Sequence, residues 1–118
     1  VNYFLTNPVL TNMAFGEIHT WDVSEVTDMS EIFSNASNFN EDISAWDVSS
    51  VTDMSNMFYR SVSFDQSISN WDVSSVTDMG DMFRSANELS DDNKCAIHNS
   101  FSSNENWPYD WDEYCGDE

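Results

Sequence analysis

The sequence predicts a short α/β solenoid, in which repeats of about 25 residues, each made of a strand, a turn and a helix, stack against one another under a C-terminal cap. Three observations lead to this fold class. The phrase WDVSSVTDMSNMF at 46–58 recurs at 71–83 as WDVSSVTDMGDMF, and at 21–33 as WDVSEVTDMSEIF. Each phrase contains two apolar patterns with different periods. The repetition stops at residue 90, where a capped helix is expected.

The repeats occupy residues 16–90, as three units of 25 residues that align without gaps. In the middle unit, Trp46 and Val48 lie on either side of Asp47, which predicts a very short strand. The apolar residues that follow recur at spacings of three and four and predict one to three turns of helix. They are Val51, Met54, Met57 and Phe58.

The start of each predicted helix carries an acidic residue. Ser50 and Asp53 have the Ser-x-x-acid form of a helix N-terminus, where Asp53 would meet the positive end of the helix dipole. Asp28 and Asp78 occupy the same place in the other two units. We therefore expect all three carboxylates in first turns of helices.

The two ends of the chain are expected to close the stack. Residues 1–15 keep the apolar character of a repeat without its motif and predict a degenerate N-terminal coil, in which Val1, Phe4 and Leu5 take core positions. Residues 91–118 predict a helical cap with Ser90 as its N-cap. The aromatic residues expected to cover the open end of the core are Trp107, Tyr109, Trp111 and Tyr114.

The chain is strongly acidic, with 22 Asp and Glu against 3 Lys and Arg, and carries a formal net charge of −19. Such a surface repels phosphate backbones and anionic membranes, so no nucleic-acid partner is expected. No apolar run is long enough to insert in a membrane. Apolar residues still make up 40% of the chain, which favours a folded domain over a disordered one.

The two cysteines, Cys95 and Cys115, predict a disulfide that closes the cap and indicate an oxidising, extracellular setting. The alternative is a zinc site made of these two thiolates and His98. A structural zinc site needs a fourth ligand, which Asp110, Asp112 or His19 would have to supply, and the sequence offers no second close pair of ligands. The disulfide is the favoured interpretation.

No enzymatic motif is present, and no cofactor is expected. The sequence contains no G-x-S-x-G, no glycine-rich phosphate loop and no EF-hand pattern. Pairs of carboxylates are inevitable in so acidic a chain, so they carry no weight as a glycosidase signature. We therefore expect a protein that is not an enzyme.

One aspartate follows each tryptophan of the repeat and forms a predicted column on the strand face. Parallel stacking would place Asp22, Asp47 and Asp72 at steps of about 4.8 Å. Each aspartate either accepts hydrogen bonds within its own turn or belongs to a surface that binds calcium or a basic partner. If the column binds, the predicted binding residues are Thr20, Asp22, Ser24, Asp47, Ser49, Asn70, Asp72 and Ser74.

The repeated phrase also resembles a known family. The spacing I-x-x-W-x-V-x-x-V resembles the L-x-x-L-x-L segment of leucine-rich repeats, and WDVSSVTDMSNMF followed by FDQSISNWDV resembles the bacterial surface protein 26-residue repeat, a BspA-like leucine-rich-repeat family. The resemblance covers residues 16–90 and implies a leucine-rich-repeat-like solenoid. It also implies a secreted or surface-anchored protein that serves adhesion or protein interaction, without catalytic residues.

The sequence therefore predicts a monomeric, non-enzymatic recognition or adhesion module of a secreted or cell-surface protein, which binds a protein or glycan through its solenoid face. Two alternatives remain open. One is a structural spacer without a ligand. The other is a cation-dependent carbohydrate-binding module, with calcium at Asp22, Asp47 and Asp72.

Overall fold

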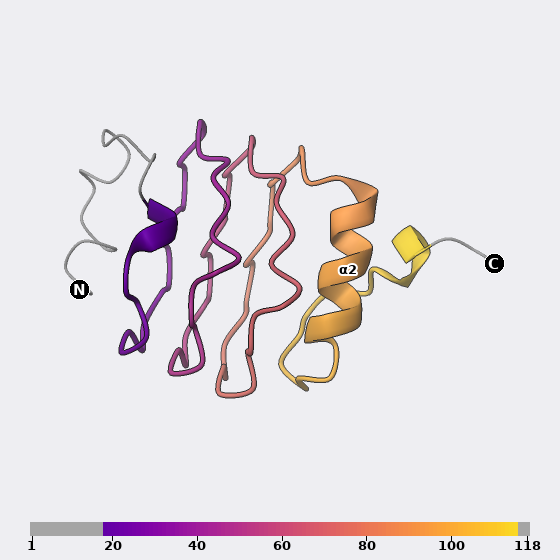
Figure 1. Ribbon diagram of the computed structural model, residues 1–118. Helices are drawn as coiled ribbons and strands as arrows, with labels where there is room; N and C mark the ends of the chain where they lie inside the picture. Colours follow the sequence, from indigo (N-terminus) through magenta and orange to yellow (C-terminus); the bar gives the residue numbers. More distant parts are fainter. Residues whose placement is uncertain (1–17, 116–118) are drawn as a thin grey trace.

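A computed structural model describes residues 18–115 of the chain. Three similar loops of chain lie side by side in a row, and the α-helix α2 (Asp91–Phe101) covers one end of the row (Figure 1). Two short 3-10 helices, η2 (Ile18–Thr20) and η3 (Asp112–Cys115), lie near the two limits of the described part. The predicted N-terminal coil at 1–15, with Val1, Phe4 and Leu5, lies outside the described residues.

The predicted α/β solenoid of leucine-rich-repeat type, made of strand, turn and helix, is wrong. Over residues 18–115, no strand extends beyond isolated parallel bridges, which pair Asp28 with Asp53 and Asp53 with Asp78. The α-helix in this range is α2, which belongs to the cap and not to a repeat. Each repeat of 25 residues is instead a series of turns, and the repeats stack on one another.

Each repeat is a succession of turns closed by backbone hydrogen bonds across three residues. In the middle repeat, the N–H of Trp46 donates to the carbonyl of Ile43 at 3.1 Å, and the N–H of Val51 donates to Val48 at 2.9 Å. Met57 donates to the carbonyl of Met54 in the same way, at 3.2 Å. All of these residues are buried. Because apolar residues begin and end each turn, they recur every third residue, which is the spacing that suggested a helix.

Two residues with left-handed backbone angles prevent each repeat from continuing as a helix. In the middle repeat they are Asn56, with φ 56°, and Arg60, with φ 60°. Asn56 is the third residue of the turn from Met54 to Met57, which is the place where a type II turn requires positive φ. The other repeats have the same feature at equivalent positions, Glu31, Asn35, Asp81 and Ser85.

Neighbouring repeats are joined through alternate backbone N–H groups. The N–H of Phe33 donates to the carbonyl of Met57 at 3.0 Å, and the N–H of Phe58 donates to Met82 at 2.8 Å. The residue that precedes each of these phenylalanines donates its N–H within its own repeat, as Met57 does to Met54. Because N–H groups bond alternately within their own turn and to the next repeat, the buried backbone groups are paired without a sheet.

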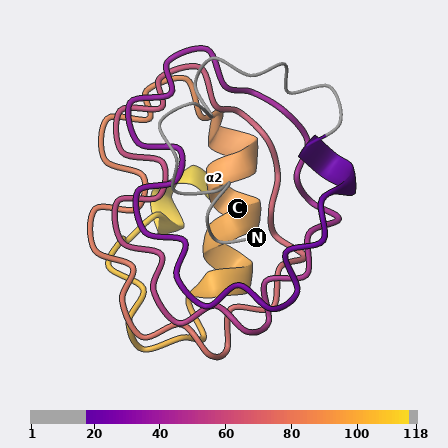
Figure 2. The same ribbon diagram turned by 90° about the vertical axis from the view of Figure 1, so that its left-hand side faces the viewer.

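The core is a set of aromatic and aliphatic columns that runs along the stack. The rings of Phe33, Phe58 and Phe83 stack in sequence, with centroids 5.6 Å and 5.3 Å apart. Viewed along the stack, the repeats superpose into one outline (Figure 2). The indole N–H of Trp46 donates to the carbonyl of Ile18 at 2.9 Å, and Trp71 does the same to Ile43 at 3.1 Å. Each tryptophan thus ties its repeat to the preceding one.

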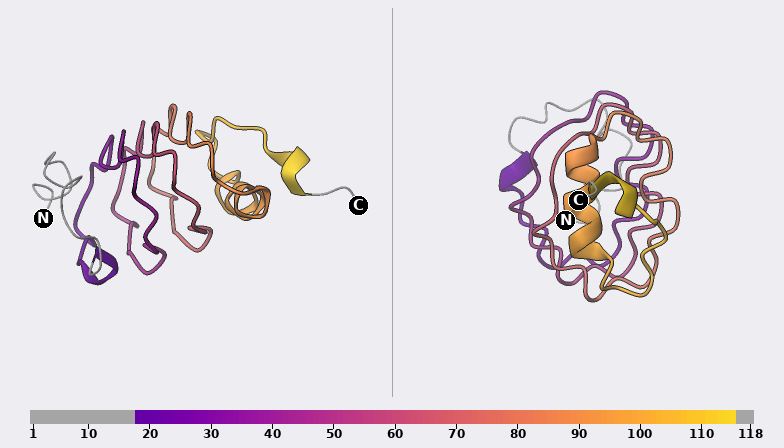
Figure 3. Two further views of the ribbon diagram at one scale, coloured as in Figure 1. Left: turned by 90° about the horizontal axis from the view of Figure 1, so that it is seen from above. Right: turned by 90° about the vertical axis from the view of Figure 1, so that its right-hand side faces the viewer.

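The helix α2 lies across the open end of the core (Figure 3). Its predicted N-cap is confirmed, because the Ser90 side chain accepts a hydrogen bond from the N–H of Asn93 at 3.2 Å. Ile97 and Phe101 are fully buried and close the apolar interior. Cys95 and Cys115, the predicted pair, are joined by a disulfide that ties η3 to this helix.

The segment after α2 makes hydrogen bonds to the third repeat that a further repeat would otherwise make. The N–H of Phe83 corresponds to those of Phe33 and Phe58, which donate to the next repeat. Here the hydroxyl of Tyr109 accepts its hydrogen bond instead, at 3.0 Å. The side chain of Asn104 donates to the carbonyls of Val73 and Val76 at 2.9 Å each. Three of the four aromatic residues expected to cover the core, Trp107, Tyr109 and Trp111, pack against it. The fourth, Tyr114, contacts the ring of Trp111 instead.

Candidate functional site

The predicted aspartate column lies on the surface, with one carboxylate for each repeat. In the middle repeat, Oδ1 of Asp47 accepts hydrogen bonds from the N–H of Ser49 at 3.0 Å and from its hydroxyl at 2.6 Å. Asp22 with Ser24, and Asp72 with Ser74, make the same two bonds. Each aspartate is therefore a turn acceptor. Both bonds fall on Oδ1, so within residues 18–115 the other oxygen, Oδ2, of these exposed aspartates has no hydrogen-bond donor.

These hydrogen bonds keep the column ionised. The side-chain bond from Ser49, followed by the backbone bond, lowers the pKa of Asp47, while repulsion from Asp72 and Asp22 raises it by less. The same pair of serine bonds lowers the pKa of Asp22 and of Asp72. Hydrogen bonds to the charged form favour that form, so the three carboxylates are negative at neutral pH.

The other predicted binding residues lie on this surface too. Thr20 and Asn70 are exposed, as are Ser49 and Ser74, while Ser24 is half-buried. The amide of Asn70 donates to the carbonyl of Ser44 at 2.9 Å and so joins the third repeat to the second. Seven of the eight residues are thus exposed and Ser24 is half-buried, and the three serines also hold the carboxylates by hydrogen bonds.

A second aspartate column is formed by the residues predicted to begin helices, Asp28, Asp53 and Asp78. No helix is present there. Oδ1 of Asp53 instead accepts from the N–H of Ser55 at 2.9 Å and from its hydroxyl at 2.7 Å, and Asp28 does the same with Ser30. The sequence already carried a signal for these turns, because Asp-x-Ser occurs twice in the first repeat and three times in the second, and its side chains form turns by themselves.

The first column ends beside a hollow that the sequence did not reveal. The hollow has a volume of about 510 Å³ and lies between the third repeat and the loop after α2. Asp72, Ser74 and Thr77 line one side, and Asn104 and Glu105 line the other. Its lining of carboxylates, hydroxyls and amides can exchange hydrogen bonds with a polar ligand.

The column does not gather three carboxylates around one point. Among residues 18–115, the group of three metal-ligating side chains with ligand atoms within 4.8 Å of one another is His98, Asp110 and Asp112, at the cap. Asp22, Asp47 and Asp72 succeed one another in a line instead. Calcium takes six to eight oxygen ligands, so an ion on this column would depend on water and on neighbouring pairs of carboxylates.

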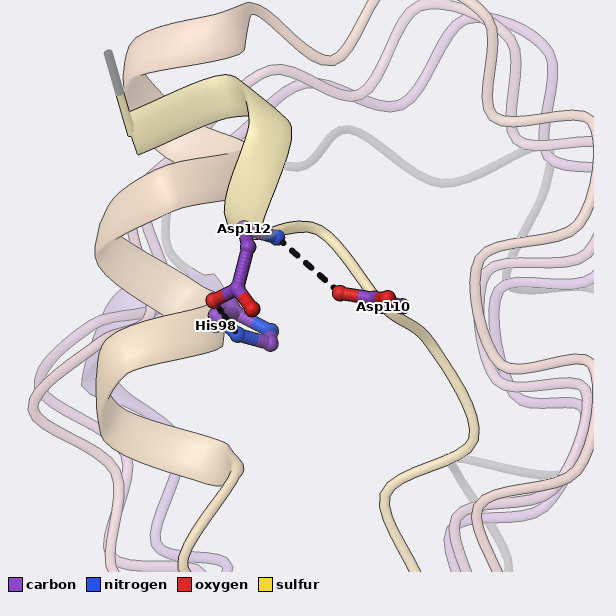
Figure 4. Close-up of side chains that lie close together, drawn as sticks. All are labelled: His98, Asp110 and Asp112. Carbon is purple, nitrogen blue, oxygen red and sulfur yellow. Dashed lines mark hydrogen bonds and ion pairs between the residues drawn. The ribbon is translucent and has the colours of Figure 1, made fainter. Parts of the chain in front are cut away.

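The cluster at the cap is shown in Figure 4. Nε2 of His98 lies 2.9 Å from Oδ1 of Asp112, and the indole N–H of Trp107 donates to Nδ1 of His98 at 3.0 Å. An Nδ1 that accepts a proton donor is unprotonated, so Nε2 carries the proton and donates it to Asp112. Binding a metal at Nε2 would move this proton to Nδ1, where it would face the indole N–H. The network therefore favours a structural histidine.

The alternative of a zinc site at the cap required the thiolates of Cys95 and Cys115, and neither is available. Both sulfur atoms that it required belong to the disulfide between Cys95 and Cys115. Of the proposed fourth ligands, Asp110 and Asp112 lie near His98, whereas His19 lines a different hollow with Glu41 and Asp42.

The family model described as "Mycoplasma protein of unknown function, DUF285" matches residues 4–108. The chain belongs to this family, since the match spans all three repeats and most of the cap. No curated protein and no solved structure matches the chain. No helix within residues 18–115 is long and apolar enough to cross a membrane.

Proposed function

We propose that this chain is a non-enzymatic recognition module that binds a basic segment of a partner protein along the column of Asp22, Asp47 and Asp72. The observation that carries the proposal is the geometry of these carboxylates. Each one is ionised and exposed, and its serine holds it through Oδ1, while Oδ2 has no hydrogen-bond donor within the described part of the chain. A fixed line of negative charges attracts lysine and arginine side chains and loses little entropy on binding them.

Two further observations support a role at a cell surface or outside the cell. The disulfide between Cys95 and Cys115 suits an oxidising compartment. The repeated phrase at 46–58 resembles that of BspA-like surface proteins, which are associated with adhesion. On this proposal the repeats provide a rigid support, and the column provides the contact surface.

The test is a titration with an oligolysine peptide of ten residues at 0.15 M NaCl, followed by isothermal calorimetry. The variant D22N/D47N/D72N removes three charges, but its amide oxygens can still accept the serine hydrogen bonds. The control D28N/D53N/D78N makes the same chemical change on the second column. The loss of three exposed charge contacts should weaken the affinity of the first variant by about tenfold.

The control variant should bind within about twofold of the wild type. Equal weakening in both variants would mean that only net charge matters and would contradict the proposal. Unchanged affinity in both would favour the spacer interpretation, in which the surface has no ligand. Circular dichroism of the three proteins verifies that each one is folded.

A second candidate is a carbohydrate-binding module that uses a cation. The hollow beside Asp72 favours it, because Ser74, Asn104 and Glu105 could pair with sugar hydroxyls there. If this candidate is right, millimolar calcium should raise the melting temperature beyond an ionic-strength control and should be needed for an oligosaccharide to bind. No effect of calcium on either quantity would eliminate it.

A further inference from the structure

A second hollow, with a volume of about 280 Å³, lies where the third repeat meets the cap. Arg84 comes from the third repeat, Lys94 from α2, and Tyr109 and Trp111 from the segment after α2. Phe83 and Leu89 add apolar surface to its lining. We refer to this site as the cap hollow.

The cap hollow concentrates positive charge in a chain that has almost none. The chain contains 3 Lys and Arg residues against 22 acidic ones, and two of these three, Arg84 and Lys94, line this site. The third, Arg60, lies over the ring of Tyr59 in the second repeat. A pair of cations in a field this negative creates a local region that can accept one anionic group.

Both cations are available for such a ligand. Arg84 lies 3.9 Å from Asp81, but these two side chains are 65% and 55% exposed, so water screens the pair and it is weak. Lys94 makes no ion pair with any carboxylate in the range 18–115. Its Nζ lies over the ring of Tyr114, 4.4 Å from the centroid, and 5.8 Å from the centroid of Trp111. These rings fix its position without neutralising it.

The aromatic side of the cap hollow offers an apolar stacking surface. The rings of Tyr109 and Trp111 are stacked, with centroids 4.9 Å apart and planes 21° apart, and both side chains are half-buried. Their remaining exposed area can be covered by the C–H face of a sugar ring, which gains the usual free energy of apolar burial. Inorganic anions have no such face.

We propose that the cap hollow binds a sugar that carries a single carboxylate, such as a uronic acid. The carboxylate pairs with Arg84 and Lys94, whose guanidinium and ammonium groups are its natural partners, while the ring packs on Tyr109 or Trp111. The volume lies near the lower end of small-molecule sites, which suits one sugar unit. The acidic surroundings repel a polyanion. This site is independent of the aspartate column and of its basic partner.

The experiment compares two probes of nearly equal size, glucuronate and glucose, by ¹⁵N-edited NMR titration of the whole oxidised chain at 0.15 M NaCl. Glucuronate should bind saturably and at least about fivefold more tightly than glucose, since it alone can pair with the cations. R84Q and K94M should each weaken glucuronate binding by a similar factor. K94M keeps an apolar stem over the rings and so preserves the packing of the cap.

The matched control is R60Q, which removes the one cation outside the cap hollow. Its affinity for glucuronate should stay within twofold of the wild type. The proposal is overturned if glucuronate shows no saturable binding, if glucose binds equally well, or if R60Q weakens binding as much as R84Q does.

Discussion

At the residue scale, the repeat places non-glycine residues in left-handed backbone conformations, which Asn and Asp tolerate better than other residues do. Glu31, Asn56 and Asp81 have φ of 63°, 56° and 55°, and none of them is glycine. The left-handed region costs an ordinary residue about 1 kcal/mol or more. The stack holds them there because the N–H of Glu31 donates to the carbonyl of Ser55, and that of Asn56 to Gly80.

We therefore expect Glu31→Gly to raise the free energy of unfolding by up to about 1 kcal/mol, because glycine adopts positive φ without strain. The control is Glu25→Gly, which replaces another exposed glutamate, one whose φ is not positive. That change should lower stability, since it only adds entropy to the unfolded chain. Urea unfolding measures the free energy of unfolding of both variants. A change of the same sign in both would contradict the positive φ of Glu31.

The aspartate column predicts a pH dependence of known sign. The pKa values of Asp22, Asp47 and Asp72 are lowered in the folded chain by their serine hydrogen bonds. A lowered pKa contributes stability that is present above the ordinary pKa of aspartate and is lost as pH falls through the folded value.

The variant D22N/D47N/D72N lacks this term, whereas every other acidic group is shared with the wild type. The stability of the wild type relative to the variant should therefore stay constant near neutral pH and decline below about pH 4. Denaturant unfolding from pH 7 to pH 2 measures it. A difference that does not change with pH would show that the serine bonds do not favour the charged form.

At the scale of elements, the cap depends on a few groups that imitate a missing repeat. The hydroxyl of Tyr109 takes the hydrogen bond that the N–H of Phe83 would otherwise give to a further repeat. Phe83 is buried, at 5% exposure, so its N–H has little access to water.

Tyr109→Phe should therefore lower the free energy of unfolding by about 1 to 3 kcal/mol, which is the usual cost of leaving a buried donor unpaired. Tyr59→Phe is the matched control, because the ring of Tyr59 contacts Arg60 and its hydroxyl makes no hydrogen bond within residues 18–115. Amide hydrogen exchange should show faster exchange at Phe83 in the first variant only. Equal exchange rates at Phe83 in both variants would mean that the Tyr109 hydroxyl does not protect this N–H.

The elements also show how far the sequence could predict the fold. The period, the buried positions and the capped helix at Ser90 followed from apolar spacing and Ser-x-x patterns. The strand–turn–helix repeat was wrong because consecutive turns and a helix both place apolar residues three apart. Glycine would have signalled the left-handed positions, but Glu31, Arg60 and Ser85 occupy them without any such signal.

The candidate site was predictable only in part, for a related reason. The aspartates and serines of the column lie two residues apart in the sequence, so local turn chemistry predicted their contact. Asn104 donates a hydrogen bond to the carbonyl of Val73, 31 positions earlier, and Arg84 and Trp111 line the same hollow only because the cap packs on the third repeat. Contacts of this range depend on how the last repeat and the cap fit together.

At the scale of the whole molecule, the net charge of −19 opposes the compact stack. Both aspartate columns add like charges along the row of repeats. Raising NaCl from 0.02 to 0.5 M should therefore raise the melting temperature by several degrees, because screening shortens the reach of this repulsion. The variant D22N/D47N/D72N should respond less than the wild type. An unchanged melting temperature across this range would mean that the columns cost the folded state little.

The central claim is that the first column contacts a basic partner, and its serine amides report on this directly. The N–H groups of Ser24, Ser49 and Ser74 bond to Asp22, Asp47 and Asp72, whereas those of Ser30, Ser55 and Gly80 bond to the second column. In an ¹⁵N-edited NMR titration with oligolysine, the first three amide resonances should shift and saturate together, and the second three should move little. Equal shifts in both sets, or none in the first, would contradict the claim.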